Sequence, residues 1–106
     1  MKGVCLRFYM NEFQKHDGIL MYEWLLELAK KNGIKGGSAF RAIAGYGRHG
    51  VIHEEHFFEL ASNVPIEVNF FIKKEESANF IDIIKKENAD LFYSMSEAEY
   101  GTTGKI

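Results

Sequence analysis

Several features are scarce in this chain, and each scarcity excludes a class of protein. Cys5 is the only cysteine, so no disulfide can form within the chain, and we expect a reducing compartment, the cytoplasm. A single proline and a hydrophobic content of 46% argue against a disordered segment. No apolar run is long enough to cross a bilayer, and the residues after Met1 lead into a strand rather than a signal peptide.

An excess of basic charge is also missing. The chain has 13 Lys and Arg residues against 15 Asp and Glu residues, which gives a net charge of −2. Nucleic-acid binders are usually strongly basic, so we expect no nucleic-acid partner. What the chain does have is enough apolar material for one core, and we predict a single domain over residues 1–106. Its aromatic content of 14% is high enough to favour self-association as well.

Apolar and polar residues alternate in several stretches, which is typical of strands covered on one side. In the first stretch, Val4, Leu6, Phe8 and Met10 share one face. The alternation that follows Pro65 is similar, with proline at the first position of a strand, where no ladder donor need be lost. The predicted strands cover approximately Val4–Met10, Ser38–Tyr46, Ile66–Ile72 and Leu91–Tyr100.

Two other stretches have the spacing of amphipathic helices. The first covers Leu20–Lys31, with Asp17 as the predicted N-cap and Asn32-Gly33 as the predicted end. The second contains Ser77, Phe80, Ile81 and Ile84 and ends near residues 85–88. Residues 47–63 are predicted to form a loop that carries a helical turn or two.

The order strand, helix, strand, strand, helix, strand predicts an α+β, ferredoxin-like βαββαβ fold with a four-stranded antiparallel sheet. Because both crossovers are right-handed, both helices are expected on the same face of that sheet. The opposite face is expected to expose Tyr9, Phe71 and Tyr93. Aromatic side chains left in water forgo about 1.5–3 kcal/mol each, so we expect this face to pack against other subunits.

Residues 41–47, Arg-Ala-Ile-Ala-Gly-Tyr-Gly, form the most informative motif. Gly45 and Gly47 could place their backbone N–H groups against an anionic ligand, with Arg41 and Arg48 on the flanks. The alternative is that both glycines only allow a strand to twist and end. Arg41 either points into the face of the sheet opposite the helices or pairs with a carboxylate such as Glu12 or Glu67. A structural ion pair is the simpler interpretation.

A cluster of histidines supports a second hypothesis from another class. His49, His53 and His56 lie within eight residues, beside Glu54 and Glu55. This spacing would suit a transition metal, and the alternative function is a small metal-binding protein or enzyme. A solvated loop is the simpler interpretation, so we assign no metal ligands. No arrangement for nucleophilic catalysis is evident, and we expect no enzymatic activity.

Taken together with Ile52-His53, residues 41–47 resemble the R-G-I-x-G-F/Y-G … I-H signature of the domain of unknown function 190 family, which is PII-like. The similarity extends over nearly the whole chain, in order and at matching spacing. Ala42 stands where the family often has glycine, and Asn63 where an acidic residue is common. Further matching segments are Leu6–Tyr9 with Glu12, Leu20–Glu23, Gly36–Ala39 and Leu60–Val68.

This resemblance implies a PII-like regulator that forms a homotrimer or a multiple of it. Its ligand clefts would lie between subunits at the base of the loop after the second strand, and AMP, ADP or ATP would be the ligand. A membrane transporter or an enzyme would be the partner protein. Residues 100–104 resemble the Thr-Gly-rich C-terminal loop of PII proteins. The expected ligand-binding residues are Arg41, Gly45, Tyr46, Gly47, Arg48 and His53.

Overall fold

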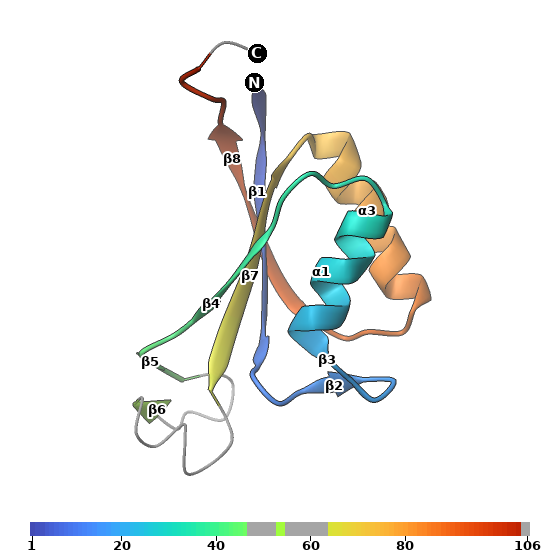
Figure 1. Cartoon of the computed structure of the whole chain (residues 1–106), viewed down its shortest axis with the longest axis vertical. Coiled ribbons are helices and arrows are strands. Elements are labelled where there is room, and N and C mark those ends of the chain that lie inside the picture. The colour runs from blue at the N-terminus through green and yellow to red at the C-terminus, as the bar shows by residue number, and fades with distance from the viewer. Residues whose placement is uncertain (47–52, 55–63, 105–106) are drawn as a thin grey trace.

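A four-stranded antiparallel sheet, with helices packed on one of its faces, makes up the frame of the molecule (Figure 1). The structure is a computed structural model, and it describes residues 1–46 and 64–104 together with the backbone of residues 53–54. The sheet has the order β4-β7-β1-β8, and every neighbouring pair is antiparallel. Its strands are β1 (Lys2–Asn11), β4 (Ser38–Arg41), β7 (Pro65–Ile72) and β8 (Phe92–Glu99). The predicted ferredoxin-like α+β fold is confirmed.

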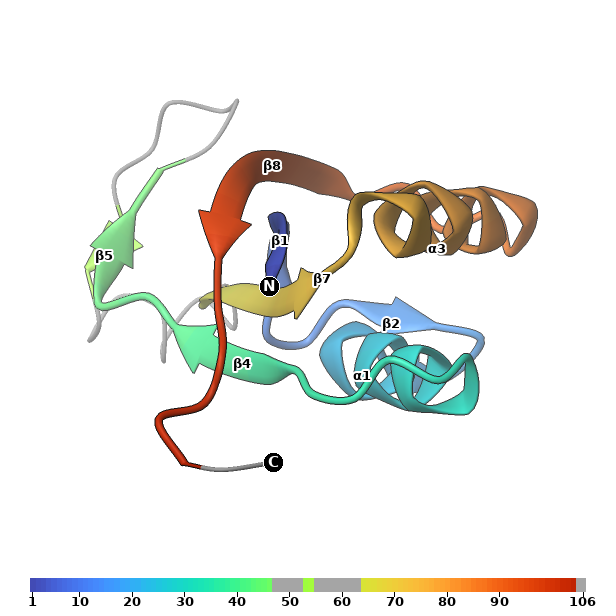
Figure 2. The same ribbon diagram turned by 90° about the horizontal axis from the view of Figure 1, so that it is seen from above.

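Helices α1 (Met21–Lys31) and α3 (Lys74–Lys86) lie on the same side of the sheet (Figure 2). Asn32 ends α1, and Gly33 follows with a φ of 84°, a conformation that favours glycine, so the predicted helix end is confirmed. At the start of α3, the Glu76 carboxylate accepts a hydrogen bond from the Lys73 amide at 3.2 Å. Neither α1 nor α3 is long and apolar enough to cross a membrane.

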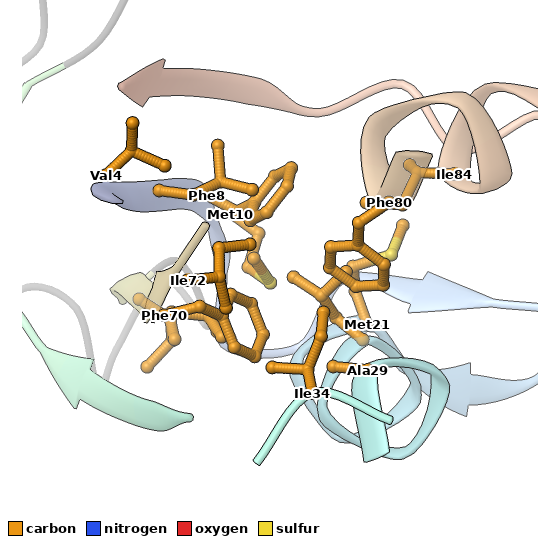
Figure 3. Close-up of a cluster of buried hydrophobic side chains, with 14 residues drawn as sticks. Val4, Phe8, Met10, Met21, Ala29, Ile34, Phe70, Ile72, Phe80 and Ile84 are labelled. Carbon is orange, nitrogen blue, oxygen red and sulfur yellow. The ribbon is translucent and has the colours of Figure 1, made fainter. Parts of the chain in front are cut away.

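The core lies between the helices and the sheet, where the alternating residues of β1 and β7 point (Figure 3). Phe8, Phe70 and Phe80 meet at its centre, with ring centroids 5.5–6.2 Å apart and nearly perpendicular ring planes. Edge-to-face packing of this kind stabilises a core beyond the burial of area alone. Leu25 from α1 and Ile84 from α3 are buried in the same cluster, so both helices are fixed to the sheet through it.

A short hairpin precedes α1, and it corrects one prediction. Strands β2 (Lys15–His16) and β3 (Ile19–Leu20) pair across Asp17 and Gly18, which both have positive φ, 50° and 81°. Asp17 is therefore a residue of a tight hairpin turn and not the predicted helix cap. The N-cap position of α1 is Leu20, and the first helical amide, that of Met21, donates to the Gln14 carbonyl at 2.7 Å.

The hairpin is fixed to α1 through an aromatic contact. The imidazole ring of His16, at the end of β2, lies against the indole ring of Trp24, with 4.1 Å between the ring centroids. The chain has no second tryptophan. Trp24 also packs against the hydrophobic core, so it connects the hairpin to α1 and to the core.

The second predicted strand, Ser38–Tyr46, is divided in two. Strand β4 ends at Arg41, and the next extended residues, β5 (Ala44–Gly45), pair with β6 (His53–Glu54) instead of with the main sheet. The chain therefore leaves the sheet at Ala42. The loop predicted for residues 47–63 lies outside the described residues apart from the backbone of β6.

The face of the sheet opposite the helices, here called the open face, combines aromatic and polar side chains. Tyr9 and Phe92 are neighbours on it, with ring centroids 5.6 Å apart, and Phe71 packs beside Tyr100 at 6.1 Å. Tyr93 was expected on this face, but it pairs with Phe8 and its ring contacts the Phe8 ring on the helix side. Phe92 takes its place, because successive residues of a strand point to opposite faces.

Polar side chains connect the strands between these aromatic pairs. Arg7 donates to the Ser96 hydroxyl at 3.2 Å, and its Nε lies 3.8 Å from a Glu67 carboxylate oxygen. The same oxygen accepts a hydrogen bond from the Asn69 amide at 3.1 Å. The open face thus has a charged centre and aromatic ends.

Candidate functional site

The candidate site lies at the end of the sheet where β4 ends and β7 begins (Figure 1). The Ala42 amide donates to the Pro65 carbonyl at 2.9 Å, so the chain leaves and re-enters the sheet at neighbouring positions. We call residues 42–64 the β4–β7 connection, and Ala42 and Val64 its two roots. Five of the predicted site residues are within this connection, and the sixth, Arg41, immediately precedes it.

Pairing of β5 with β6 brings together two predicted site residues that are distant in the sequence. Gly45 and His53 are direct partners in this two-stranded ribbon. A Cβ atom added to Gly45 would lie 3.9 Å from the Pro65 ring, which is ordinary van der Waals contact, and Gly45 has no positive φ. The backbone conformation therefore does not require glycine here, and the space beside Gly45 could accommodate a Cβ atom.

Tyr46 follows directly and presents its ring to the surroundings. Tyr46 is 72% exposed, and Ile43, earlier in the connection, is 78% exposed. An exposed aromatic ring beside a glycine offers a flat apolar surface next to unobstructed backbone. This combination suits a ligand that has both a planar ring and an anionic group.

Arg41 forms an ion pair with Glu12, one of the two carboxylates considered from the sequence. The other, Glu67, lies near Arg7 on the open face. The Arg41 side chain is 54% exposed, whereas that of Glu12 is only 16% exposed. The ion pair therefore has one well-solvated partner, which can be approached from outside, and one largely enclosed partner.

Glu12 is the residue of the site that the sequence alone did not assign. Besides its ion pair with Arg41, its backbone amide donates to the Val64 carbonyl at 2.6 Å. A single residue after β1 thus contacts β4 and the start of β7. The sequence shows that Glu12 belongs to a segment matching the family. It does not show these contacts, because Arg41 and Val64 are far from Glu12 in the sequence.

The remaining predicted residues cannot be located in the same way. Gly47 and Arg48 lie outside the described residues, as do His49 and His56 of the alternative metal hypothesis. His53 is described by its backbone only, in β6. Within the described part of the chain, no three His, Cys, Asp or Glu side chains group as ligands of a metal ion.

Solved structures similar to this one are PII-like proteins. A structure of CPII bound to ADP and bicarbonate, from Thiomonas intermedia K12, aligns with a TM-score of 0.68 and 17% identity, over 96% of this chain and 91% of that one. A second structure of CPII, a nitrogen regulatory PII-like protein of the same organism bound to ADP, AMP and bicarbonate, aligns with a TM-score of 0.69 and 16% identity over the same shares. At such low identity, these similarities establish the fold alone.

Sequence relatives are more closely similar. A UPF0166 protein of Aquifex aeolicus (strain VF5) is 36% identical over 85 residues, which are 80% of this chain and 81% of the relative. A UPF0166 protein of Methanocaldococcus jannaschii is 36% identical over 66 residues, which are 62% of this chain and 60% of the relative. The model of the DUF190 family, described as "Uncharacterized ACR, COG1993", matches residues 3–100. The resemblance found in the sequence is thereby confirmed, and the chain belongs to the DUF190 family.

Proposed function

We propose that this chain is a single-domain, cytosolic PII-like regulator that binds an adenine nucleotide or a similar small anionic ligand between subunits and signals to a partner protein. The observation that carries this proposal is the pairing of Gly45 with His53 beside Arg41, at one end of the sheet. The PII-like fold supports it, because CPII has the same fold and was solved with ADP and AMP bound. Catalysis is not part of the proposal.

The chemistry of the described residues fits a nucleotide. The exposed Tyr46 ring would stack on a purine base, and the Gly45 backbone would allow a phosphate to approach closely. Arg41 would supply positive charge through a guanidinium that matches phosphate geometry. Arg48 and His53 complete the proposed set of ligand contacts, together with Gly47.

The open face supports a homotrimer, or a multiple of it. Three phenylalanines lie on this face and are 55%, 54% and 75% exposed, namely Phe40, Phe71 and Phe92. Packing three copies around a three-fold axis would cover this apolar surface and place the β4–β7 connection near a subunit boundary. Each ligand cleft would then contain residues of two chains. The partner would be a transporter or an enzyme that responds to whether the ligand is bound.

Ligand binding is tested by calorimetric titration and thermal shift with AMP, ADP, ATP, cyclic nucleotides and bicarbonate. We expect at least one adenine nucleotide to bind and raise the melting temperature, because a ligand that binds only the folded state stabilises it. Tyr46→Ala should weaken binding, and Ile43→Ala, which truncates a similarly exposed side chain of the same connection, is the matched control. A folded protein that binds nothing in this panel would contradict the nucleotide proposal.

The oligomeric state is tested separately by light scattering. We expect a mass of three times the 12.2 kDa chain, or a multiple of that value, at micromolar concentration. A clean monomer would overturn the trimer and, with it, the cleft between subunits.

A further inference from the structure

Glu12 contacts both ends of the β4–β7 connection. Its carboxylate pairs with Arg41, directly before the first root, and its amide donates to the carbonyl of Val64, the second root. A third bond closes the same region, from the Ala42 amide to the Pro65 carbonyl. Because β4 and β1 flank β7 on its two sides, the Glu12–Arg41 ion pair crosses over the start of β7. Together, these three contacts hold Ala42 and Val64, the two roots, at the same end of the sheet; we call them the fastening of the roots.

The two partners of this ion pair differ in their dependence on it. Glu12 is 16% exposed, so its carboxylate has little water to replace the guanidinium. Arg41 is 54% exposed and can reach an anion arriving from outside. An enclosed charge that loses its partner is costly, whereas a half-exposed charge is not. Any anion that recruits Arg41 must therefore offset the cost of leaving Glu12 unpaired.

We infer that Glu12 is an autoinhibitory residue, which competes with an anionic ligand for Arg41 and thereby couples ligand binding to opening of the roots of the β4–β7 connection. This inference rests on the proposed function, which supplies the ligand. When the ligand draws Arg41 away from Glu12, the fastening of the roots loses its ion pair. The competition lowers the affinity for the ligand. It also means that ligand binding weakens the backbone contacts at Ala42, next to Arg41. The site thus has two states, one in which Arg41 pairs with Glu12 and one in which Arg41 binds the ligand.

The test uses Glu12→Gln, Arg41→Gln and the double variant, with Glu97→Gln as the matched control. Glu97 lies in β8 opposite Val4, and Val4 pairs with Ile72 at the far end of β7, so its substitution removes the same charge far from the roots. Hydrogen exchange of the Ala42 amide is measured without ligand, at low and high ionic strength. ADP and inorganic diphosphate are then titrated by calorimetry against each variant.

Without ligand, Glu12→Gln should accelerate exchange at Ala42 by about three- to fivefold, the scale of a partly exposed ion pair. High salt should accelerate it in the parent protein and have little further effect in the variant. Unchanged exchange in Glu12→Gln would overturn the fastening. This arm needs no ligand, so it is decided even if no nucleotide binds.

With ADP, Glu12→Gln should raise the affinity by about three- to fivefold, Arg41→Gln should lower it, and Glu12→Gln should have no effect when Arg41 is already replaced. A purely structural role would lower affinity or leave it unchanged in Glu12→Gln, and either result would overturn the competition. Should Glu12→Gln not fold, Glu12→Asp, which retracts the carboxylate by one methylene, is expected to change both readouts in the same directions. If the parent protein binds neither ADP nor diphosphate, the competition is overturned, and the full ligand panel described above decides the proposed function separately.

Discussion

At Gly37 the backbone passes directly beside the ring of Phe70. A Cβ atom at this position would lie 2.4 and 2.7 Å from two carbons of that ring and 3.1 Å from a methyl group of Leu26. Phe70 belongs to the phenylalanine cluster and is fully buried, so its ring cannot move aside without disturbing the core. Because Gly37 has no side chain, the segment between α1 and β4 can pack this closely against the sheet.

We predict that Gly37→Ala destabilises the fold by about 1–3 kcal/mol, as overpacking of a core does. The neighbouring Gly36→Ala is the matched control, because a Cβ atom there meets no other atom within 4 Å. Urea unfolding followed by circular dichroism measures both. Equal effects of the two substitutions would show that backbone freedom, and not space beside Phe70, determines the result.

At the scale of elements, the start of α3 shows how one contact determines a helix boundary. Glu75 and Glu76 both lie in the first turn and both favour the positive end of the helix dipole. Only Glu76 accepts a hydrogen bond from the Lys73 amide among the side chains described here. Comparing substitutions of Glu75 and Glu76 therefore separates the contribution of the capping hydrogen bond from that of the helix dipole.

We predict that Glu76→Ala costs about 0.5–1 kcal/mol of unfolding free energy more than Glu75→Ala, because it removes a capping hydrogen bond as well as a charge. The comparison is made by urea unfolding at low and high salt. The capping contribution should persist at high salt, whereas the dipole contribution should shrink. If the difference between the two variants vanished with salt, the hydrogen bond would contribute nothing.

Elements with a clear period were predictable from the sequence, and those defined by local turn chemistry were not. The alternation in β1 and β7 and the helical spacing in α1 and α3 gave boundaries within a few residues, because these residues face one core. The β2–β3 hairpin was missed, although Asp17-Gly18 is a strong signal for a tight hairpin turn. Its strands are two residues each, too short for any period to appear.

The candidate site was predictable only in part. An ion pair of Arg41 with a carboxylate was considered from the alternation, and Gly45 and Tyr46 were predicted at the end of the strand Ser38–Tyr46, which in the structure ends at Arg41. The departure of β5 from the main sheet and its pairing with β6 could not be predicted, because nothing in Ala44–Gly45 distinguishes one partner strand from another. The choice of Glu12 over Glu67 likewise depends on the register of three strands.

For the whole molecule, the distribution of exposed aromatic rings matters more than their number. Phe71 lies on the open face, and Phe13 lies in the segment between β1 and β2; both residues are 54% exposed. Equal exposure means that the two residues differ in location and not in burial within one chain. They are therefore a matched pair for asking which surface other subunits cover.

We predict that Phe71→Glu dissociates the oligomer and that Phe13→Glu does not. A carboxylate in a covered apolar interface should cost about 2 kcal/mol or more of association free energy, which corresponds to a change of about thirtyfold or more in the association constant. Sedimentation over a concentration series measures the change, and circular dichroism verifies that both variants are folded. If both variants dissociated to the same extent, the open face would not be the interface.

The contact between Trp24 and His16 makes the molecule its own optical reporter. Because the chain has one tryptophan, the emission of the indole comes from Trp24 alone, which contacts His16 of the β2–β3 hairpin and also packs against the core. Circular dichroism, in contrast, averages over the backbone of the whole chain. If the hairpin detaches before the sheet unfolds, fluorescence will change at a lower denaturant concentration than ellipticity; if the domain unfolds as one unit, the two curves will coincide. A single fluorophore, unlabelled and native to the chain, therefore distinguishes local from global unfolding.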